Sequence, residues 1–592
     1  MTSPKSVYAA RLAERTEQLA GLERRHRWLG PARLVCFLLI LGIAWLATSR
    51  PSVPGWLVFG PVAAFVVLVV VHLRARRAMA RVQRGMAFLS RGMARIDGQW
   101  AGSGQSGVPW EEPGHPFAAD LDLFGVGSLF ELLCEARTIA GERTLAQWLQ
   151  HPADGATVRS RHAAVVELAP RVEFRESLAV LGQEVRNSFD ERVLVRWAET
   201  DTPVFPTHTI WICRIAVTLL LIAVSGALAG WWTATPVLFG VMAVAAVGAT
   251  YRRRTKTAID GVGAASRELE DLAELVARLE AEPVQGEYLT GLRQRLTAGA
   301  RPASVHIWRL RRLIGLLDSR GNQLVMLVLP LLLWTTQLAV AISRWRRDVG
   351  PAIGGWISAV GEYEALASVS GYAFEHPEAV LPEFSIGAGF RAQGLGHPLL
   401  HGGGVRNDVD LGGERKLMVV SGSNMSGKST LLRSVGSAVV MAQMGAPVVA
   451  TSLTLEPLAL GASISTHDSL QEGSSRFYAE ITRLRQILDL AEGTPRLLYL
   501  LDELLSGTNS HDRRLGAEAV VRRLAGLGAI GILTTHDLAL SRIATDMEPQ
   551  AVNVHFRDHL EGERIAFDYR MHPGIVERGN ALALMRSIGL EV

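Results

Sequence analysis

The chain has 592 residues, of which 48 % are hydrophobic and 20 % are charged, and its mean hydropathy is +0.19. This composition excludes a disordered or low-complexity chain, which would lack the apolar surface that folding buries. Three cysteines exclude a disulfide framework and a zinc site made of four cysteines. The formal net charge of +4 is small for this length, so net charge alone identifies no partner.

The N-terminal part predicts a membrane hairpin. Residues 1–32 are expected to form a charged cytosolic helix, because they lack the pattern of a signal peptide. Within residues 33–73, two uncharged runs, Leu34–Thr48 and Trp56–Leu73, lie on either side of two prolines, which is typical of two membrane-spanning helices. Residues 74–116 predict a basic helix followed by a linker rich in Gly, Ser and Pro.

A second hairpin interrupts a helical region. Residues 117–208 have helical apolar spacing, and residues 209–251 contain two more uncharged runs, Ile215–Trp231 and Thr233–Thr250. A buried helix of a soluble core is the alternative, but four runs in two pairs disfavour it. Basic residues on the flanks place both ends of each hairpin in the cytosol, and they include Arg24, Arg25, Arg27, Arg74, Arg76, Arg77, Arg252, Arg253 and Arg254.

The predicted secondary structure changes in the C-terminal part of the chain. Residues 252–384 predict charged, lever-like helices, whereas residues 385–592 alternate short β-rich runs with helical ones. Such alternation indicates a parallel α/β sheet. A strand at Lys416–Val420 runs directly into GSNMSGKST and then into a helical pattern, which is the context that a phosphate-binding loop requires.

This loop predicts binding of ATP with Mg²⁺. Its glycines allow close approach to phosphate, and its backbone N–H groups supply positive potential. Lys428 is expected to contact the β- and γ-phosphates, and the Ser429 hydroxyl is expected to ligate Mg²⁺. The predicted nucleotide-binding residues of the loop are Gly422, Ser423, Asn424, Met425, Ser426, Gly427, Lys428, Ser429 and Thr430.

Two later strands supply candidate catalytic groups. The apolar run Leu497–Leu501 ends in Asp502 and Glu503, and another run precedes His536. We expect Asp502 to hold Mg²⁺ and Glu503 to orient or deprotonate the attacking water. His536 is expected to sense the γ-phosphate, with a purely structural role as the alternative.

The apolar run at residues 324–342 is the exception among the candidate spans. A fifth crossing would place the phosphate loop outside the cell, whereas ATP is cytosolic. Both flanks of this run are also basic, with Arg309, Arg311 and Arg312 before it. The sequence therefore predicts a helix that is buried in protein or lies at the membrane interface.

The C-terminal motifs resemble the ATPase domain of the MutS family, within the ABC-type ATPases. The matching segments are GSNMSGKST at 422–430, ISTHDSLQEGSSRFYAEITRL at 464–484, DELLSGTNSHDR at 502–513, TTHDLAL at 534–540 and YRMHPGIVERGNALALMRSIGL at 569–590. Residues 128–168 are similar to the start of the family's helical core domain. The arrangement is similar to a membrane-anchored branch of MutS-related proteins.

The resemblance implies a homodimer that sandwiches ATP. Ser475 of one chain would reach the γ-phosphate at Lys428 of the other, and Asn407 would lie at the nucleotide. Two departures stand out. A hairpin and linker take the place of the family's mismatch-reading domains, and Gly404 stands where an aromatic residue that stacks on adenine is expected. The sequence Phe174-Arg175-Glu176 spells the family's mismatch wedge, but within the apparent core, so we interpret it as coincidence.

Together these patterns predict an α/β P-loop ATPase domain of ABC type at the C-terminus. An all-α domain like the MutS core and two transmembrane hairpins are expected before it. The predicted function is a Mg²⁺-dependent ATPase of the inner membrane, with its ATPase domain in the cytosol, lipid contacts and a DNA or mismatch-repair role. The alternative is an ATP-driven membrane scaffold or remodelling protein acting on a protein or lipid partner without DNA. A transporter is disfavoured, because the four spans offer no polar pathway.

Overall fold

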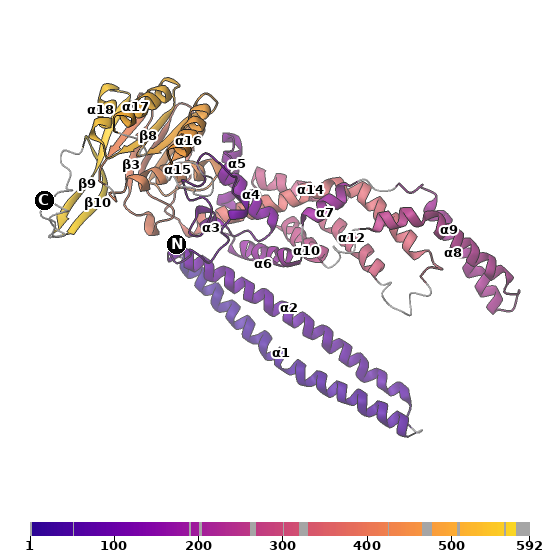
Figure 1. Cartoon of the computed structure of the whole chain (residues 1–592). Helices are drawn as coiled ribbons and strands as arrows, with labels where there is room; N and C mark the ends of the chain where they lie inside the picture. Colours follow the sequence, from indigo (N-terminus) through magenta and orange to yellow (C-terminus); the bar gives the residue numbers. More distant parts are fainter. Residues whose placement is uncertain are drawn as a thin grey trace. The chain divides into compact units, whose positions relative to one another are not determined.

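The computed structural model forms two compact units, which are described separately (Figure 1). Residues 1–134, 146–180 and 368–592 belong to the first unit, and residues 135–145 and 181–367 belong to the second. The described residues are 3–50, 53–188, 191–200, 204–260, 268–299, 301–318, 329–423, 425–464, 476–505, 510–561 and 564–575.

The first unit begins with a long helical hairpin. Helices α1 (Pro4–Ser49) and α2 (Phe59–Ile96) run antiparallel and side by side, joined through the short helix η1 (Gly55–Val58) (Figure 1). Ser3 caps α1, because its hydroxyl accepts from the Ser6 N–H at 3.2 Å. The charged N-terminal helix and the first apolar run are therefore one continuous helix. The same is true of the second apolar run and the basic stretch that follows it.

The base of this hairpin is anchored by buried charge. The carboxylate of Glu375 accepts from the Tyr8 hydroxyl at 2.9 Å and pairs with Arg95 at 2.6 Å. Arg15 of α1 pairs with Glu176 at 2.7 Å. At Gly92 a Cβ atom would lie 2.5 Å from the Tyr8 ring, so only glycine allows the two helices to approach this closely.

A six-stranded sheet forms the centre of the C-terminal domain. Its order is β10-β9-β4-β8-β7-β6, and every pair is parallel except β10 with β9. This agrees with the predicted parallel sheet and adds an antiparallel edge. The strands are β4 (Leu417–Ser421), β6 (Leu458–Ser463), β7 (Arg496–Asp502), β8 (Ile530–Thr535), β9 (Ala551–Glu561) and β10 (Arg564–Pro573).

Helices cover both faces of this sheet. α16 (Arg476–Ala491), α17 (Ser510–Gly526) and α18 (Leu538–Asp546) pack on one face, over a buried core that includes Tyr499. α15 (Lys428–Met444) packs on the other. A second sheet, of order β1-β5-β2-β3, has no counterpart among the predicted elements. It comprises β1 (Glu383–Phe384), β2 (Phe390–Leu395), β3 (Asn407–Leu411) and β5 (Ser452–Leu455), with η5 (His401–Gly403) in the connection between β2 and β3.

The predicted linker is followed by a segment that packs on the ATPase domain. Phe117, Leu121 and Leu123 are buried. The Ala462 N–H of β6 donates to the Pro116 carbonyl at 3.0 Å, so this segment is held at the sheet. The neighbouring helices are η2 (Val108–Trp110), α3 (Leu129–Leu133), α4 (Ile139–Gln150), α5 (Gly155–Leu168) and α6 (Val172–Ser188).

The second unit is helical. Its apolar hairpin is closed by Trp232, whose indole N–H donates to the Ala223 carbonyl at 2.8 Å. The part of the predicted buried run that the structure describes, 329–342, leads into α14, and Ala339, Val340 and Ile342 are buried there. The helices are α7 (Glu191–Glu199), α8 (Thr209–Leu228), α9 (Thr235–Ile259), α10 (Glu268–Ala281), α11 (Glu287–Thr297), α12 (Ala303–Asp318) and α14 (Trp334–Glu375).

Candidate nucleotide-binding site

The phosphate loop joins β4 to α15. Its shape depends on positive backbone φ angles, which residues other than glycine seldom adopt. The φ angle is +106° at Gly427 and +70° at Met425. The Lys428 ammonium group donates to the carbonyls of Gly422 at 2.9 Å and Ser423 at 2.8 Å. Lys428 is 5 % exposed, and its burial lowers the pKa of the ammonium group, whereas Glu503 and Asp502 oppose this shift. The lysine is thus already held inside the loop.

The two residues predicted to bind Mg²⁺ lie together. The Ser429 hydroxyl donates to the Asp502 carboxylate at 2.5 Å, and the other Asp502 oxygen accepts from Thr534 of β8. A hydroxyl and a carboxylate are the hard oxygen ligands that Mg²⁺ prefers. The donor set therefore fits Mg²⁺, with Ser429 and Asp502 as the residues that would hold it.

The candidate catalytic glutamate follows directly. Glu503 has φ of +48°, and its N–H donates to the Thr534 carbonyl at 3.2 Å, which turns the chain sharply at the end of β7. Its carboxylate lies 3.9 Å from the Lys428 ammonium nitrogen and 3.4 Å from Nδ1 of His536. Five predicted residues from three segments thus converge at the carboxyl ends of β4, β7 and β8.

The same region matches a known family. Residues 418–591 match the family model MutS domain V. The C-terminal domain is a MutS domain V. MutS domain V is an ATPase domain, so the predicted enzymatic class of this domain is confirmed.

Known relatives share this domain. The chain is 36 % identical over 195 residues to an endonuclease MutS2 of Thermus thermophilus, which is 33 % of this chain and 25 % of that protein. It is 32 % identical to a DNA mismatch repair protein MutS 2 of Halobacterium salinarum and 30 % identical to a DNA mismatch repair protein MutS of Shouchella clausii; each match covers 39 % of this chain and 27 % of the relative. The chain therefore spans about a quarter of the length of these relatives.

Tyr569, which lies beside the phosphate loop of the MutS domain V, was not predicted from the sequence. A Cβ atom on Gly427 would lie 3.3 Å from the ring of Tyr569, which is 44 % exposed. Asn407 holds this part of β10, because its side-chain amide donates to the Tyr569 carbonyl at 3.0 Å and its oxygen accepts from the Met571 N–H at 2.7 Å. Asn407 therefore positions an aromatic residue beside the loop. The signal available in the sequence was the unexplained tyrosine before MHPG.

Two predicted nucleotide-binding residues, Asn424 and Ser475, lie outside the described residues. The apparent mismatch wedge is structural. Phe174 and Arg175 are 2 % and 1 % exposed, and the Arg175 guanidinium lies 5.4 Å from the centre of the Phe374 ring. The interpretation of this motif as coincidence agrees with its burial.

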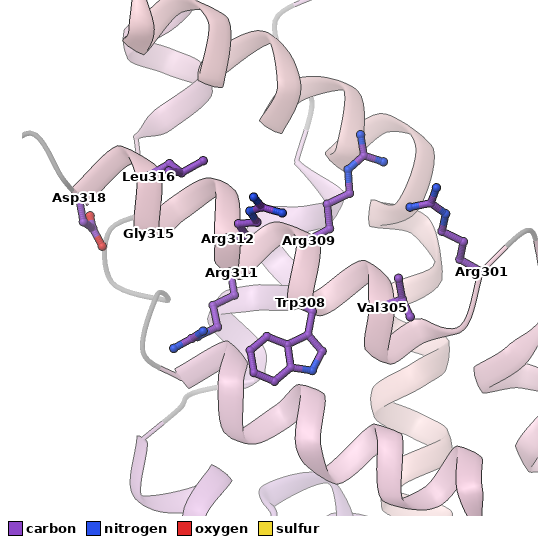
Figure 2. A pocket seen from close by; sticks show the side chains of 9 residues that line it. All are labelled: Arg301, Val305, Trp308, Arg309, Arg311, Arg312, Gly315, Leu316 and Asp318. Carbon is purple, nitrogen blue, oxygen red and sulfur yellow. The ribbon is translucent and has the colours of Figure 1, made fainter. Parts of the chain in front are cut away.

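The second unit carries an arginine-rich pocket of about 850 Å³ (Figure 2). Figure 2 shows Arg309 and Arg312 extending from one side of α12 and Arg311 with Trp308 from another. Arg311 pairs with Glu270 and lies 5.1 Å from the Trp308 ring centre. Concentrated guanidinium groups of this kind attract phosphate-bearing partners. The remaining charged residues of the pocket are Arg301 and Asp318.

Proposed function

We propose that this chain is a membrane-anchored, MutS-like ATPase that binds and hydrolyses ATP with Mg²⁺ at a site shared by two ATPase domains of a homodimer. The observation that carries the proposal is the convergence of Lys428, Ser429, Asp502 and Glu503 within a MutS domain V. Lys428 supplies a cation that binds phosphate, Ser429 and Asp502 supply two Mg²⁺ ligands, and Glu503 supplies a general base. Together these are the groups that phosphoryl transfer to water requires.

Each residue has a separate task in hydrolysis. Lys428 neutralises charge on the β- and γ-phosphates, and the helix dipole of α15 adds to the same effect. Ser429 and Asp502 would hold Mg²⁺, which would supply further positive charge to the phosphates. Glu503 accepts the proton of the attacking water. His536, which adjoins Glu503 at 3.4 Å, is placed to respond to the γ-phosphate through that carboxylate.

The homodimer rests on the family resemblance. In that arrangement Ser475 of each chain completes the site of its partner, so ATP closes the dimer and hydrolysis opens it. In this proposal Tyr569 and Asn407 line the side of the site that contacts the adenine base. This tyrosine supplies the aromatic face that Gly404 cannot supply.

Membrane anchoring is supported by four helices that are long and apolar enough to cross a bilayer, within Pro4–Ser49, Gly55–Ile96, Thr209–Leu228 and Thr235–Ile259. The most apolar windows of the first pair contain no buried residue. A protein in water does not expose apolar surface of this extent without a partner. With the basic flanks in the cytosol, both hairpins return the chain to the side where ATP is present.

The role of DNA separates two versions of this function. Relatives are named as mismatch repair proteins and as an endonuclease, and the arginines around α12 suit a phosphate backbone. The alternative is an ATP-driven scaffold that acts on a protein or lipid partner. It is favoured by the hairpin and linker that stand where the mismatch-reading domains are expected.

The test uses the full chain purified in detergent, with ATP hydrolysis measured alone and with homoduplex, mismatched and branched DNA. We expect ATP hydrolysis that depends on Mg²⁺ and that Lys428→Ala abolishes. Absence of ATP hydrolysis by the wild-type protein would overturn the proposal. Binding of DNA that weakens steeply with salt supports the DNA-linked version. Hydrolysis without DNA binding supports the scaffold.

A further inference from the structure

A cluster of two histidines and a glutamate lies outside the nucleotide site. One possible ligand atom from each of Glu112, His115 and His151 lies within 4.8 Å of the other two. The three residues line a cavity of about 340 Å³ in the first unit. They come from two segments, the loop after η2 and the end of α4, while α15, β6 and α16 of the ATPase domain complete the wall.

The protonation of His115 suits a metal ligand. Its Nε2 atom lies 3.1 Å from the Gln150 carbonyl and therefore carries the proton, which leaves the lone pair on Nδ1. That Nδ1 atom is buried and has no hydrogen-bond partner among the described residues. Metal-binding histidines typically donate their second ring nitrogen to a carbonyl in this way.

Gln150 also fixes the loop that carries Glu112 and His115. Its side-chain oxygen accepts from the Glu112 N–H at 2.9 Å, and its side-chain nitrogen donates to the Trp110 carbonyl at 3.1 Å. His151 Nε2 lies 2.9 Å from the Glu112 carboxylate. Ligand atoms around tetrahedral zinc are about 3.3 Å apart. The side chains of Glu112 and His151 are half-exposed, so core packing does not prevent their rotation to this spacing.

We propose that Glu112, His115 and His151 bind a divalent transition-metal ion of the zinc class, with a fourth ligand position open to the cavity. Two imidazoles and one carboxylate suit such an ion better than Mg²⁺ or Ca²⁺, which prefer oxygen ligands. Arg483 of α16 donates to the His115 carbonyl at 2.7 Å. A bound ion would tie the loop after η2 to the end of α4, and Arg483 joins the same loop to a helix of the MutS domain V.

The test uses the full chain in detergent without a histidine tag, stripped with a chelator. Zn²⁺ binding is followed by calorimetry, and Co²⁺ binding by its visible absorption. We expect one Zn²⁺ per chain and a rise in melting temperature. Glu112 and His151 are half-exposed, so Glu112→Gln and His151→Gln should leave the fold intact. We expect each substitution to weaken Zn²⁺ binding by about 100-fold.

The matched control is His208→Gln, an exposed histidine at the start of α8. It should leave Zn²⁺ affinity unchanged, and nucleotide binding should be retained in all three variants. Equal Zn²⁺ affinity in wild type, Glu112→Gln and His151→Gln would show binding elsewhere and would overturn the proposal. Absence of Zn²⁺ and Co²⁺ binding at micromolar free metal would overturn it as well.

Discussion

At the scale of single residues, the nucleotide site separates binding from chemistry. Lys428 and Ser429 lie at the start of α15, whereas Glu503 lies at the end of β7 and is held by a turn with positive φ. Lys428 and Ser429 act on phosphate and Mg²⁺, and Glu503 acts on water. Substitution of each residue therefore has a distinct expected outcome.

Glu503→Gln should slow ATP hydrolysis by at least about 100-fold, because it removes the general base. ATP binding should be retained, since the amide keeps the shape of the side chain and Lys428 is unchanged. Single-turnover hydrolysis and equilibrium binding of labelled ATP measure the two effects. Glu492→Gln, an exposed residue paired with Arg523, is the control. Full hydrolysis by Glu503→Gln would remove Glu503 from the mechanism.

Tyr569→Ala should weaken ATP binding by about tenfold, the usual loss when an aromatic ring no longer stacks on a base. Tyr569→Phe keeps the ring and should retain the affinity. Tyr478→Ala, at an exposed tyrosine of α16, is the control. Equal ATP affinity in Tyr569→Ala and wild type would show that this ring makes no contact with the nucleotide.

Glu364 of α14 gives the second unit a pH dependence. It is 1 % exposed and accepts from the backbone N–H groups of Arg137 at 3.2 Å and Thr138 at 3.1 Å; its burial raises the pKa to about 7. Between its unfolded pKa and about 7 the folded chain binds a proton that the unfolded chain lacks. Stability therefore falls as pH rises through about 7.

Glu364→Gln should remove this slope, because the amide is neutral at all these pH values. The melting temperature of wild type should fall relative to the variant between about pH 5 and about pH 7. Parallel melting curves for the two proteins across this range would contradict the assignment. Glu378→Gln, at an exposed position, serves as the control.

At the scale of elements, the hairpins are the feature with the greatest consequence. Among the described residues, α1 and α2 contact the rest of the first unit near their base, through Tyr8, Arg15 and Arg95, and they expose apolar side chains beyond it. A helix that changes from charged to apolar along its length without a break is typical of one that enters a bilayer from the cytosol.

Cysteine labelling tests this arrangement in intact cells. In a background without the three native cysteines, Thr48→Cys and Thr233→Cys lie at the far ends of the hairpins and should react with a membrane-impermeant maleimide from outside. Thr16→Cys is exposed on the same helix as Thr48 and should react only after lysis. Reaction of Thr16→Cys in intact cells, or protection of both far ends, would refute the predicted topology.

At the scale of the whole molecule, the proposed site needs two chains. ATP hydrolysis per chain should rise with protein concentration, because the proposed dimer would bring Ser475 to the opposite loop. A mixture of Ser475→Ala and Lys428→Ala should recover up to about one quarter of wild-type hydrolysis, since half of the chains form mixed dimers with one intact site. Activity independent of concentration, together with a mixture that stays inactive, would argue against the shared site.

The parts of the nucleotide site that are formed by contiguous residues could be predicted from the sequence. The loop around Lys428 and the strand end at Asp502 are local patterns, and the parallel sheet brings them together without further information. The contact of Asn407 with β10 joins residues far apart in the chain, and no local pattern predicts it. Packing of Phe117 and Leu121 on the ATPase sheet was missed because the apolar spacing of residues 117–208 predicted a purely helical region.

The clamp at Glu375 has a mechanical consequence. Glu375 ends α14 directly before the ATPase sheets, and it binds both members of the first hairpin. With 46 residues, α1 is about 69 Å long, so a tilt of about 5° at this pivot sweeps its far tip by about 6 Å. In the proposed membrane-anchored arrangement, a modest rocking of the clamp would thus be magnified into a stroke that deforms the bilayer.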